Sequence, residues 1–260
     1  MSTLSRNELK RLASLQQKKY RQEYQQCVIE GVRLCEDALH SDWILREFYI
    51  TDDFQKNPSF NQLAGLAGEK HLNPTMITEP EMQKITATNH PQGVALVADI
   101  PDVHTLDPDP EGSPRIVLLD GISDPGNLGT IMRSADWFGI RHLAFGPGTV
   151  EWTNPKVLRA SMGAAFRLTI SEIHHWKKQI NSLKSAGYTI LAAEMEGVNP
   201  GAFHTEKNPH WGLILGNEAH GVSPQLNSAA DMKLSIPGDG PADSLNVAMA
   251  GTVLLYELSQ

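Results

Sequence analysis

The chain has 260 residues, of which 40% are hydrophobic and 20% are charged. This composition is typical of a soluble globular protein with one or two domains, and it excludes collagen-like, low-complexity and wholly disordered chains. No apolar run approaches the roughly 18 residues that a membrane-spanning helix needs. The N-terminus also lacks the apolar core of a signal peptide, so we expect a cytoplasmic protein.

The formal net charge is −8, from 22 basic and 30 acidic residues, which argues mildly against nucleic acid as a partner. The first 34 residues differ, with seven basic and three acidic side chains. The basic residues of this arm are Arg6, Lys10, Arg11, Lys18, Lys19, Arg21 and Arg33. The arm could bind RNA phosphates, with Lys18, Lys19 and Arg21 as the first candidates, although charge alone favours a solvated helix face.

Cysteine and histidine spacing predicts neither disulfides nor a metal site. The two cysteines, Cys27 and Cys35, are too few for a disulfide framework and do not form a CxxC pair. The ten histidines form no HxxxH or HExxH pattern.

Residues 1–100 are predicted to form a small α/β domain. The periodicity predicts helical structure over 4–26 and 31–41, and strands over 27–31, 46–51 and 93–100. Residues 101–114 hold four prolines and four acidic residues, and are predicted to be a linker.

Residues 115–260 alternate short apolar segments with helices or loops, which indicates a buried parallel sheet covered by helices. The strand candidates are 115–122, 142–146, 166–170, 189–195, 211–218 and 232–237. Residues 245–260 have apolar positions at helical spacing and are predicted to form the last helix.

Ligands bind outside the carboxyl ends of parallel strands, and three loops there are rich in Gly, Asn, Asp and Ser: 120–130, 216–223 and 237–246. The glycines of the second loop would let the backbone approach a ligand closely. The absence of both a GxGxxG pattern and a Walker loop disfavours a dinucleotide oxidoreductase.

Each loop also has a purely structural interpretation. Asn127 and Arg133 could lie on a well-capped helix, with the arginine at the surface, and Glu218 could be an exposed turn residue. Asp243 or Ser244 could be the N-cap of the last helix.

Together, the three loops resemble the motifs of the SpoU (TrmH-type) RNA 2′-O-ribose methyltransferases. Residues 119–135 (LDGISDPGNLGTIMRSA) resemble motif 1, residues 214–222 (ILGNEAHGV) motif 2, and LSIP at 234–237 with SLNVA at 244–248 motif 3. Residues 154–164 also fit this family, and the resemblance covers about residues 115–258. Glu30-Gly31 and Pro91-Gln92-Gly93 resemble, more weakly, the ribosomal-protein-like RNA-binding domain that many members carry.

The resemblance implies an α/β fold in which a parallel sheet carries a deep C-terminal trefoil knot, preceded by a small α/β domain. It implies an RNA-binding domain at 1–100 and a methyltransferase domain at 115–260. It also implies S-adenosylmethionine as cofactor, a homodimer, and an RNA substrate, with ribosomal RNA favoured over tRNA. No membrane or metal is implied as a partner.

The resemblance also assigns site residues. The cofactor-binding residues would be Leu215, Gly216, Asn217, Ile236 and Leu245. The catalytic residues would be Asn127, Arg133, Glu218, Ser244 and Asn246. In this assignment Arg133 abstracts a proton or contacts phosphate with support from Asn127, Glu218 orders the site, and Ser244 and Asn246 position the reacting groups.

Two alternatives stay open at this point. One is a tRNA 2′-O-methyltransferase. The other is an RNA-binding or assembly protein without activity, which the presence of all five catalytic candidates disfavours.

Overall fold

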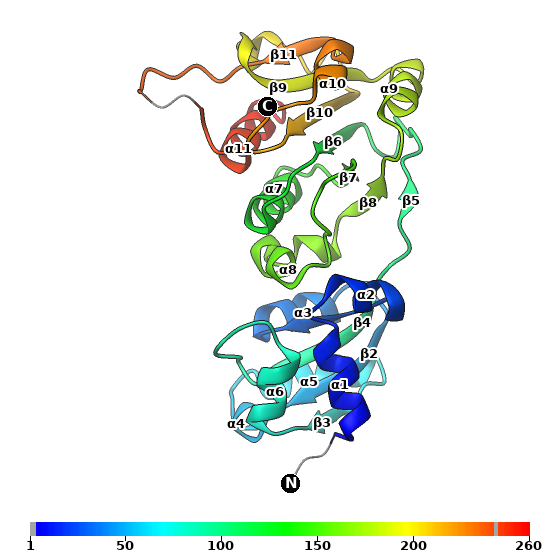
Figure 1. The fold of residues 1–260 in the computed structure, drawn as a ribbon, viewed down its shortest axis with the longest axis vertical. Coiled ribbons are helices and arrows are strands. Elements are labelled where there is room, and N and C mark those ends of the chain that lie inside the picture. The colour runs from blue at the N-terminus through cyan, green and yellow to red at the C-terminus, as the bar shows by residue number, and fades with distance from the viewer. Residues whose placement is uncertain (1–3, 242–243) are drawn as a thin grey trace. The chain divides into compact units, whose positions relative to one another are not determined.

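The computed structural model describes residues 4–241 and 244–260. By its internal contacts the chain divides into two units (Figure 1). The first contains the residues up to Asp102 together with Glu151–Phe166, and the second contains Val103–Val150 and Arg167–Gln260. The prediction of two separately folding domains, joined by a linker at 101–114, stays a prediction.

The first unit is a small α/β structure, as predicted, with a mixed four-stranded sheet in the order β1-β4-β2-β3. Its strands are β1 (Gln26–Glu30), β2 (Leu45–Ile50), β3 (Pro74–Met76) and β4 (Val94–Asp99). β4 is antiparallel to both β1 and β2, and β3 is parallel to β2. The helices are α1 (Arg6–Ser14), α2 (Lys18–Tyr24), α3 (Val32–Leu39), α4 (Asp52–Gln55), α5 (Phe60–Glu69), α6 (Glu79–Ile85) and α8 (Pro155–Ser161).

The expectation that Arg21 contacts RNA phosphates is wrong, because its guanidinium is buried. The side chain is 2% exposed, and its Nε and Nη2 donate to the two carboxylate oxygens of Glu151 at 2.9 and 2.8 Å. Its Nη1 donates to the carbonyls of Leu15 and Gln16. Arg21 therefore joins the end of α1 to the segment at Glu151, whereas Lys18 and Lys19 stay exposed.

The second unit is built on a seven-stranded sheet in the order β11-β9-β10-β6-β7-β8-β5, and every neighbouring pair is parallel, as predicted. The strands are β5 (His104–Thr105), β6 (Arg115–Asp120), β7 (His142–Phe145), β8 (Thr169–Glu172), β9 (Thr189–Val198), β10 (Trp211–Gly216) and β11 (Met232–Leu234). The helices are α7 (Pro125–Trp137), α9 (Trp176–Ser185), α10 (Pro224–Ala229) and α11 (Val247–Glu257).

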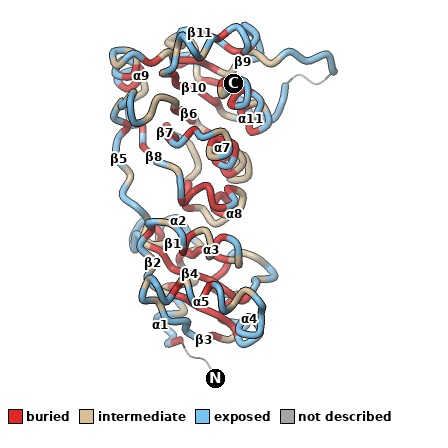
Figure 2. Tube along the Cα trace, turned by 180° about the vertical axis from the view of Figure 1, so that it is seen from behind, coloured by how far each residue is buried: buried red, intermediate tan, exposed pale blue. Residues whose placement is uncertain are grey.

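Helices cover both faces of this sheet, because alternate strand residues point to opposite sides. Ile116, Leu118 and Ile214 belong to a buried cluster with residues of α9 and α10. On the other face, Gly251 of α11 lies against Leu215, where an added Cβ would come within 2.9 Å of a leucine methyl. The strands at the centre of the sheet are accordingly buried (Figure 2).

In the described part of the chain, no helix is both long and apolar enough to cross a membrane.

Candidate functional site

The site lies where two neighbouring strands, β6 and β10, end. Gly216, the last residue of β10, pairs with Asp120, the last residue of β6. The chain continues from β6 to β7 on one side, whereas β10 and β9 lie on the other. Ligands bind in parallel sheets at such a point, where the order of the strands reverses. Two of the predicted loops meet here.

Glu218 joins the loop after β10 to the start of α7. Its Oε2 accepts hydrogen bonds from the backbone amide and hydroxyl of Ser123 at 3.1 and 2.9 Å. Its Oε1 accepts from the backbone amide of Asp124 and from Nδ2 of Asn127, both at 3.0 Å. Glu218 is thus an exposed turn residue, as the structural interpretation has it, but its carboxylate also connects this turn to the start of α7.

These hydrogen bonds also set the charge of Glu218. Partial burial by itself raises the pKa of this carboxyl, but hydrogen bonds from Asn127, Asp124 and Ser123 outweigh burial and lower the pKa to about 2. Glu218 is therefore ionised at any physiological pH.

Asn127 connects Glu218 to the third loop. While its Nδ2 donates to Glu218, its Oδ1 accepts from Nδ2 of Asn246 at 3.0 Å. The Oδ1 of Asn246 accepts from the backbone amide of Ala248 at 2.9 Å, so Asn246 is the N-cap of α11. The expectation that Ser244 caps this helix is wrong, and Asp243 lies outside the described residues. We name the group Asn127, Glu218 and Asn246 the polar cluster.

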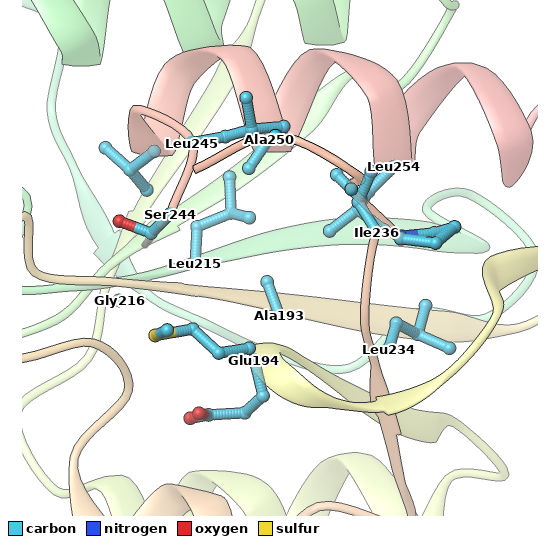
Figure 3. A pocket seen from close by; sticks show the side chains of 15 residues that line it. Ala193, Glu194, Leu215, Gly216, Leu234, Ile236, Ser244, Leu245, Ala250 and Leu254 are labelled. Atoms are coloured by element: carbon cyan, nitrogen blue, oxygen red, sulfur yellow. The ribbon is translucent and has the colours of Figure 1, made fainter. Parts of the chain in front are cut away.

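Beside the polar cluster is a cavity of about 470 Å³, between the ends of β9 and β10 and the segment that leads into α11 (Figure 3). Its lining is mainly apolar and includes Leu234, Ala250 and Leu254. Four predicted cofactor residues line it: Leu215, Gly216, Ile236 and Leu245. This volume and lining are typical of a site for a small organic ligand.

Gly216 has a structural role besides the predicted close approach to a ligand. A Cβ at this position would lie 2.2 Å from the backbone of Gly221 and Val222, so glycine is needed because the chain turns tightly back on itself here. The predicted approach to a ligand stays a prediction, and Gly216 lines the cavity. Gly221 and Asn217 exchange backbone hydrogen bonds at 2.9 and 3.0 Å, which closes the turn.

Asn217 is the predicted cofactor residue that lies outside the cavity lining. Its Nδ2 donates to the carbonyl of Gly121 at 2.7 Å and its Oδ1 accepts from the amide of Ala219 at 2.9 Å. Its side chain thus joins the loops after β6 and β10.

Of the remaining candidates, Ser244 lines the cavity and Arg133 is separate from the polar cluster. Asn127 and Arg133 both lie on α7, six residues apart. In an α-helix this spacing separates two residues by about 9 Å along the axis and about 120° around it, so the two side chains lie on different faces of α7. Arg133 is exposed and, within the described residues, forms no hydrogen bond or ion pair.

Sequence reasoning missed the contribution of β9, whose residues Ala193, Glu194 and Met195 line the cavity. β9 lies next to β10 in the sheet, although the two strands are separated in the sequence by a helical turn and a loop. To predict that β9 lines the cavity, one needs the order of the strands in the sheet, and no local pattern encodes that order.

Comparison with known proteins agrees with this geometry. Residues 114–256 match the SpoU rRNA Methylase family, and residues 6–96 match the MRM3-like substrate binding domain. The 23S rRNA (guanosine(2553)-2′-O)-methyltransferase RlmP of Bacillus subtilis is 30% identical over 246 residues, which are 94% of this chain and 92% of that protein.

Solved structures are similar over the whole chain. The AdoMet-bound rRNA methyltransferase from Sinorhizobium meliloti has a TM-score of 0.83 and 28% identity, covering 99% of this chain and 96% of that one. The crystal structure of an RNA 2′-O ribose methyltransferase also has a TM-score of 0.83, with 26% identity over 98% of this chain and 95% of that one.

The fold, the polar cluster and these relatives define an RNA methyltransferase. The chain belongs to the SpoU rRNA methylase family. The predictions of an RNA 2′-O-ribose methyltransferase and of S-adenosylmethionine as cofactor are confirmed.

Proposed function

We propose that the chain transfers a methyl group from S-adenosylmethionine to the 2′-hydroxyl of one nucleotide of ribosomal RNA. The observation that carries the proposal is that the polar cluster adjoins an apolar cavity, since Asn246 lies between Leu245 and Val247, which line that cavity. The names of the family and of the B. subtilis and S. meliloti relatives favour ribosomal RNA over tRNA.

The cavity would hold the cofactor through shape and apolar contact. Leu215, Ile236 and Leu245 offer aliphatic surface for an adenine ring, and the backbone near Gly216 offers hydrogen-bonding groups. When bound, S-adenosylmethionine supplies an electrophilic methyl group on a sulfonium. Ser244, at the edge of the same cavity, would position the reacting groups.

The polar cluster would receive the acceptor ribose. Because Glu218 is ionised and holds Asn127, the Asn127 amide keeps one orientation toward Asn246. A fixed set of donors and acceptors can align a hydroxyl with the methyl–sulfur bond, which is the main requirement of this transfer.

Arg133 would contact the phosphate next to the target ribose rather than act as a free base. An arginine guanidinium holds its proton so strongly that the neutral form is scarcely populated at neutral pH. A planar guanidinium that binds the phosphate can still bring the hydroxyl into line.

A second copy of the chain would complete the site. Trp137 on α7 is 82% exposed, and Met249, Val253 and Tyr256 of α11 are 62%, 39% and 49% exposed. These side chains, here named the apolar face, lie on two helices that pack together, and α7 also carries Arg133. Exposed apolar area of this kind is typical of a surface that a partner covers. A symmetric dimer would bring Arg133 to the site of the other copy.

We also infer a trefoil knot in the C-terminal part of the chain. The close approach of β9 to β11 supports this inference, because a Cβ at Gly197 would lie only 2.5 Å from the carbonyl of Lys233.

The test is transfer of labelled methyl groups from S-adenosylmethionine to total RNA by the purified protein. Alkali cleaves RNA through a free 2′-hydroxyl, so ribose methylation leaves the label in alkali-resistant dinucleotides. We expect the label there, in RNA of ribosomal size. Label in mononucleotides would place the methyl group on a base and contradict the proposal. Label confined to tRNA would favour the tRNA alternative, and no label would favour a non-catalytic RNA-binding protein.

A further inference from the structure

Residues 174–178 (HHWKK), where the chain passes from β8 into α9, are here named the basic segment. The second unit is acidic as a whole, with nine lysines and arginines against fifteen aspartates and glutamates. Lys177 and Lys178 are the only two of these nine that are adjacent in the sequence, and no acidic residue occurs between Glu172 and Glu194. The basic segment therefore has a charge opposite to that of the unit that carries it.

The basic side chains of the segment are exposed and available to a partner. Among the residues that the structure describes, the side chains of His175, Lys177 and Lys178 form no hydrogen bond or ion pair. Nε2 of His174 lies 3.8 Å from a carboxylate oxygen of Glu172. By contrast, aspartates hold three other basic residues of this unit: Arg141, Arg167 and Lys184. Exposed charges of one sign without counter-charges attract an anionic partner.

The basic segment begins at the same edge of the sheet as the polar cluster. All strands of this sheet are parallel, and the segment follows the carboxyl end of β8, just as the loops of the polar cluster follow β6 and β10. In the order β10-β6-β7-β8, β8 is two strands from β6, which is about 10 Å at the ordinary spacing of strands.

Trp176 fixes the basic segment to the loops beside the polar cluster. Its indole packs over Gly146, where an added Cβ would lie 2.1 Å from a ring carbon. The loop that starts at Gly146 is bonded in turn to the loop after β6, because the amide of Val150 donates to the carbonyl of Ile122 at 2.8 Å. The next residue, Ser123, donates to the polar cluster. Packing therefore holds the basic segment in place relative to the polar cluster.

We propose that the basic segment binds the RNA strand beside the acceptor nucleotide. This rests on the proposed methylation of RNA at the polar cluster. An acceptor ribose at that cluster brings its neighbouring nucleotides over this edge of the sheet. Lys177 and Lys178 would contact phosphates, which fixes the position of the strand without reading its sequence. The imidazoles of His174 and His175 offer flat surfaces on which unpaired bases can stack. The segment does not line the cofactor cavity, so it acts on RNA alone.

The first test measures binding of ribosomal RNA from cells without the gene, at several salt concentrations. Lys177→Gln combined with Lys178→Gln should lower the slope of log affinity against log salt by about 1.4–1.8, for two phosphates no longer neutralised. The KM for this RNA should rise, and affinity for S-adenosylhomocysteine should not change. The control is Lys207→Gln combined with Lys233→Gln, which removes the same charge from two exposed lysines of this unit and should leave the slope unchanged.

The second test locates the RNA that the segment contacts. Both native cysteines, Cys27 and Cys35, are buried, so a cysteine introduced at an exposed position can be labelled selectively with an iron chelate that cleaves RNA. Labelled Lys178→Cys should cut the strand around the methylated nucleotide, whereas labelled Lys207→Cys should not.

Three outcomes would overturn the inference and leave the methyl transfer intact: an unchanged slope in the Lys177 and Lys178 variant, an equal fall in the control, or cuts from Lys178→Cys only at sites far from the methylated nucleotide. A wild-type protein that transfers no methyl group to this RNA would instead contradict the proposed function, and this inference with it.

Discussion

At the scale of the residue, the site depends on hydrogen-bond partners more than on burial. Glu218 has no basic neighbour in the sequence, and its side chain is exposed. Its charge is stabilised by backbone amides of Ser123 and Asp124 and by Asn127, which lie more than 90 residues away in the chain. Local spacing cannot reveal such partners, so only the resemblance to a family pointed to Glu218.

The first prediction concerns Glu218 and pH. Because folding lowers the pKa of this carboxyl to about 2, its contribution to stability is complete above its ordinary pKa of 4.5 and is lost as the pH falls toward 2. Glu218→Gln should therefore lower the Tm by about 2–5 °C at pH 7. The gap in unfolding free energy between wild type and variant should stay constant from pH 7 to 5 and shrink at lower pH. A gap that widened on acidification would contradict the network.

The second prediction concerns Arg133. If it binds the phosphate beside the acceptor ribose, Arg133→Ala should reduce methyl transfer at saturating cofactor by about 100-fold or more. Affinity for S-adenosylhomocysteine should barely change, because Arg133 does not line the cavity. Arg133→Lys should restore little, since an ammonium cannot reproduce the planar fork. Lys207→Ala, exposed in the loop before β10, is the control. A fully active Ala or Lys variant would remove Arg133 from the mechanism.

At the scale of the element, most strands were predictable and several boundaries were not. The apolar runs at 115–122, 142–146 and 211–218 correspond to β6, β7 and β10. The strand predicted from Phe166 begins only at Thr169, because Phe166 lies in a 3-10 helix (Ala164–Phe166) and packs edge-on against Trp43, with ring centroids 4.8 Å apart.

The N-terminal helical stretch, predicted over residues 4–26, also differs from the prediction in its boundaries. It is two helices, α1 and α2, and the bend between them presents the Leu15 and Gln16 carbonyls to Arg21. Arg21 looks like one more basic residue in the sequence, and its contact with Glu151, 130 residues away, cannot be predicted from local spacing.

The third prediction uses that distinction. Replacing Lys18 and Lys19 together by Gln should weaken RNA binding and lower the slope of log affinity against log salt by about 0.7–0.9 for each phosphate that the protein no longer neutralises. Arg21→Gln should act on folding, lowering stability by about 3 kcal/mol, since it leaves the carboxylate of Glu151, which is only 13% exposed, without its charged partner. An unchanged salt slope in the lysine variant would show that α2 is only a solvated helix. An Arg21 variant of normal stability would contradict the buried ion pair.

At the scale of the whole molecule, the parallel sheet with helices on both faces followed from apolar strands alternating with helices. The order of its strands did not, and it is this order that places β9 beside β10 and forms the cavity. Strand order arises from long-range packing, so no window of sequence contains it.

The fourth prediction concerns the dimer. Val253→Asp places a charge in the middle of the apolar face and should convert a dimer to a monomer in sedimentation experiments. Methyl transfer should fall with it, because Arg133 would no longer reach the second site. Glu257→Gln, an exposed neighbour on α11, should stay dimeric and active. A wild-type protein that sediments as a monomer at all concentrations, or a fully active Val253→Asp monomer, would contradict a shared site.

The most direct test of the central claim is a map of ribose methylation over the ribosomal RNA of cells with and without the gene. We expect one 2′-O-methyl group to disappear on deletion and to return with the wild-type gene, but not with Arg133→Ala. Unchanged ribose methylation in ribosomal RNA, or loss of a base methyl group in its place, would contradict it.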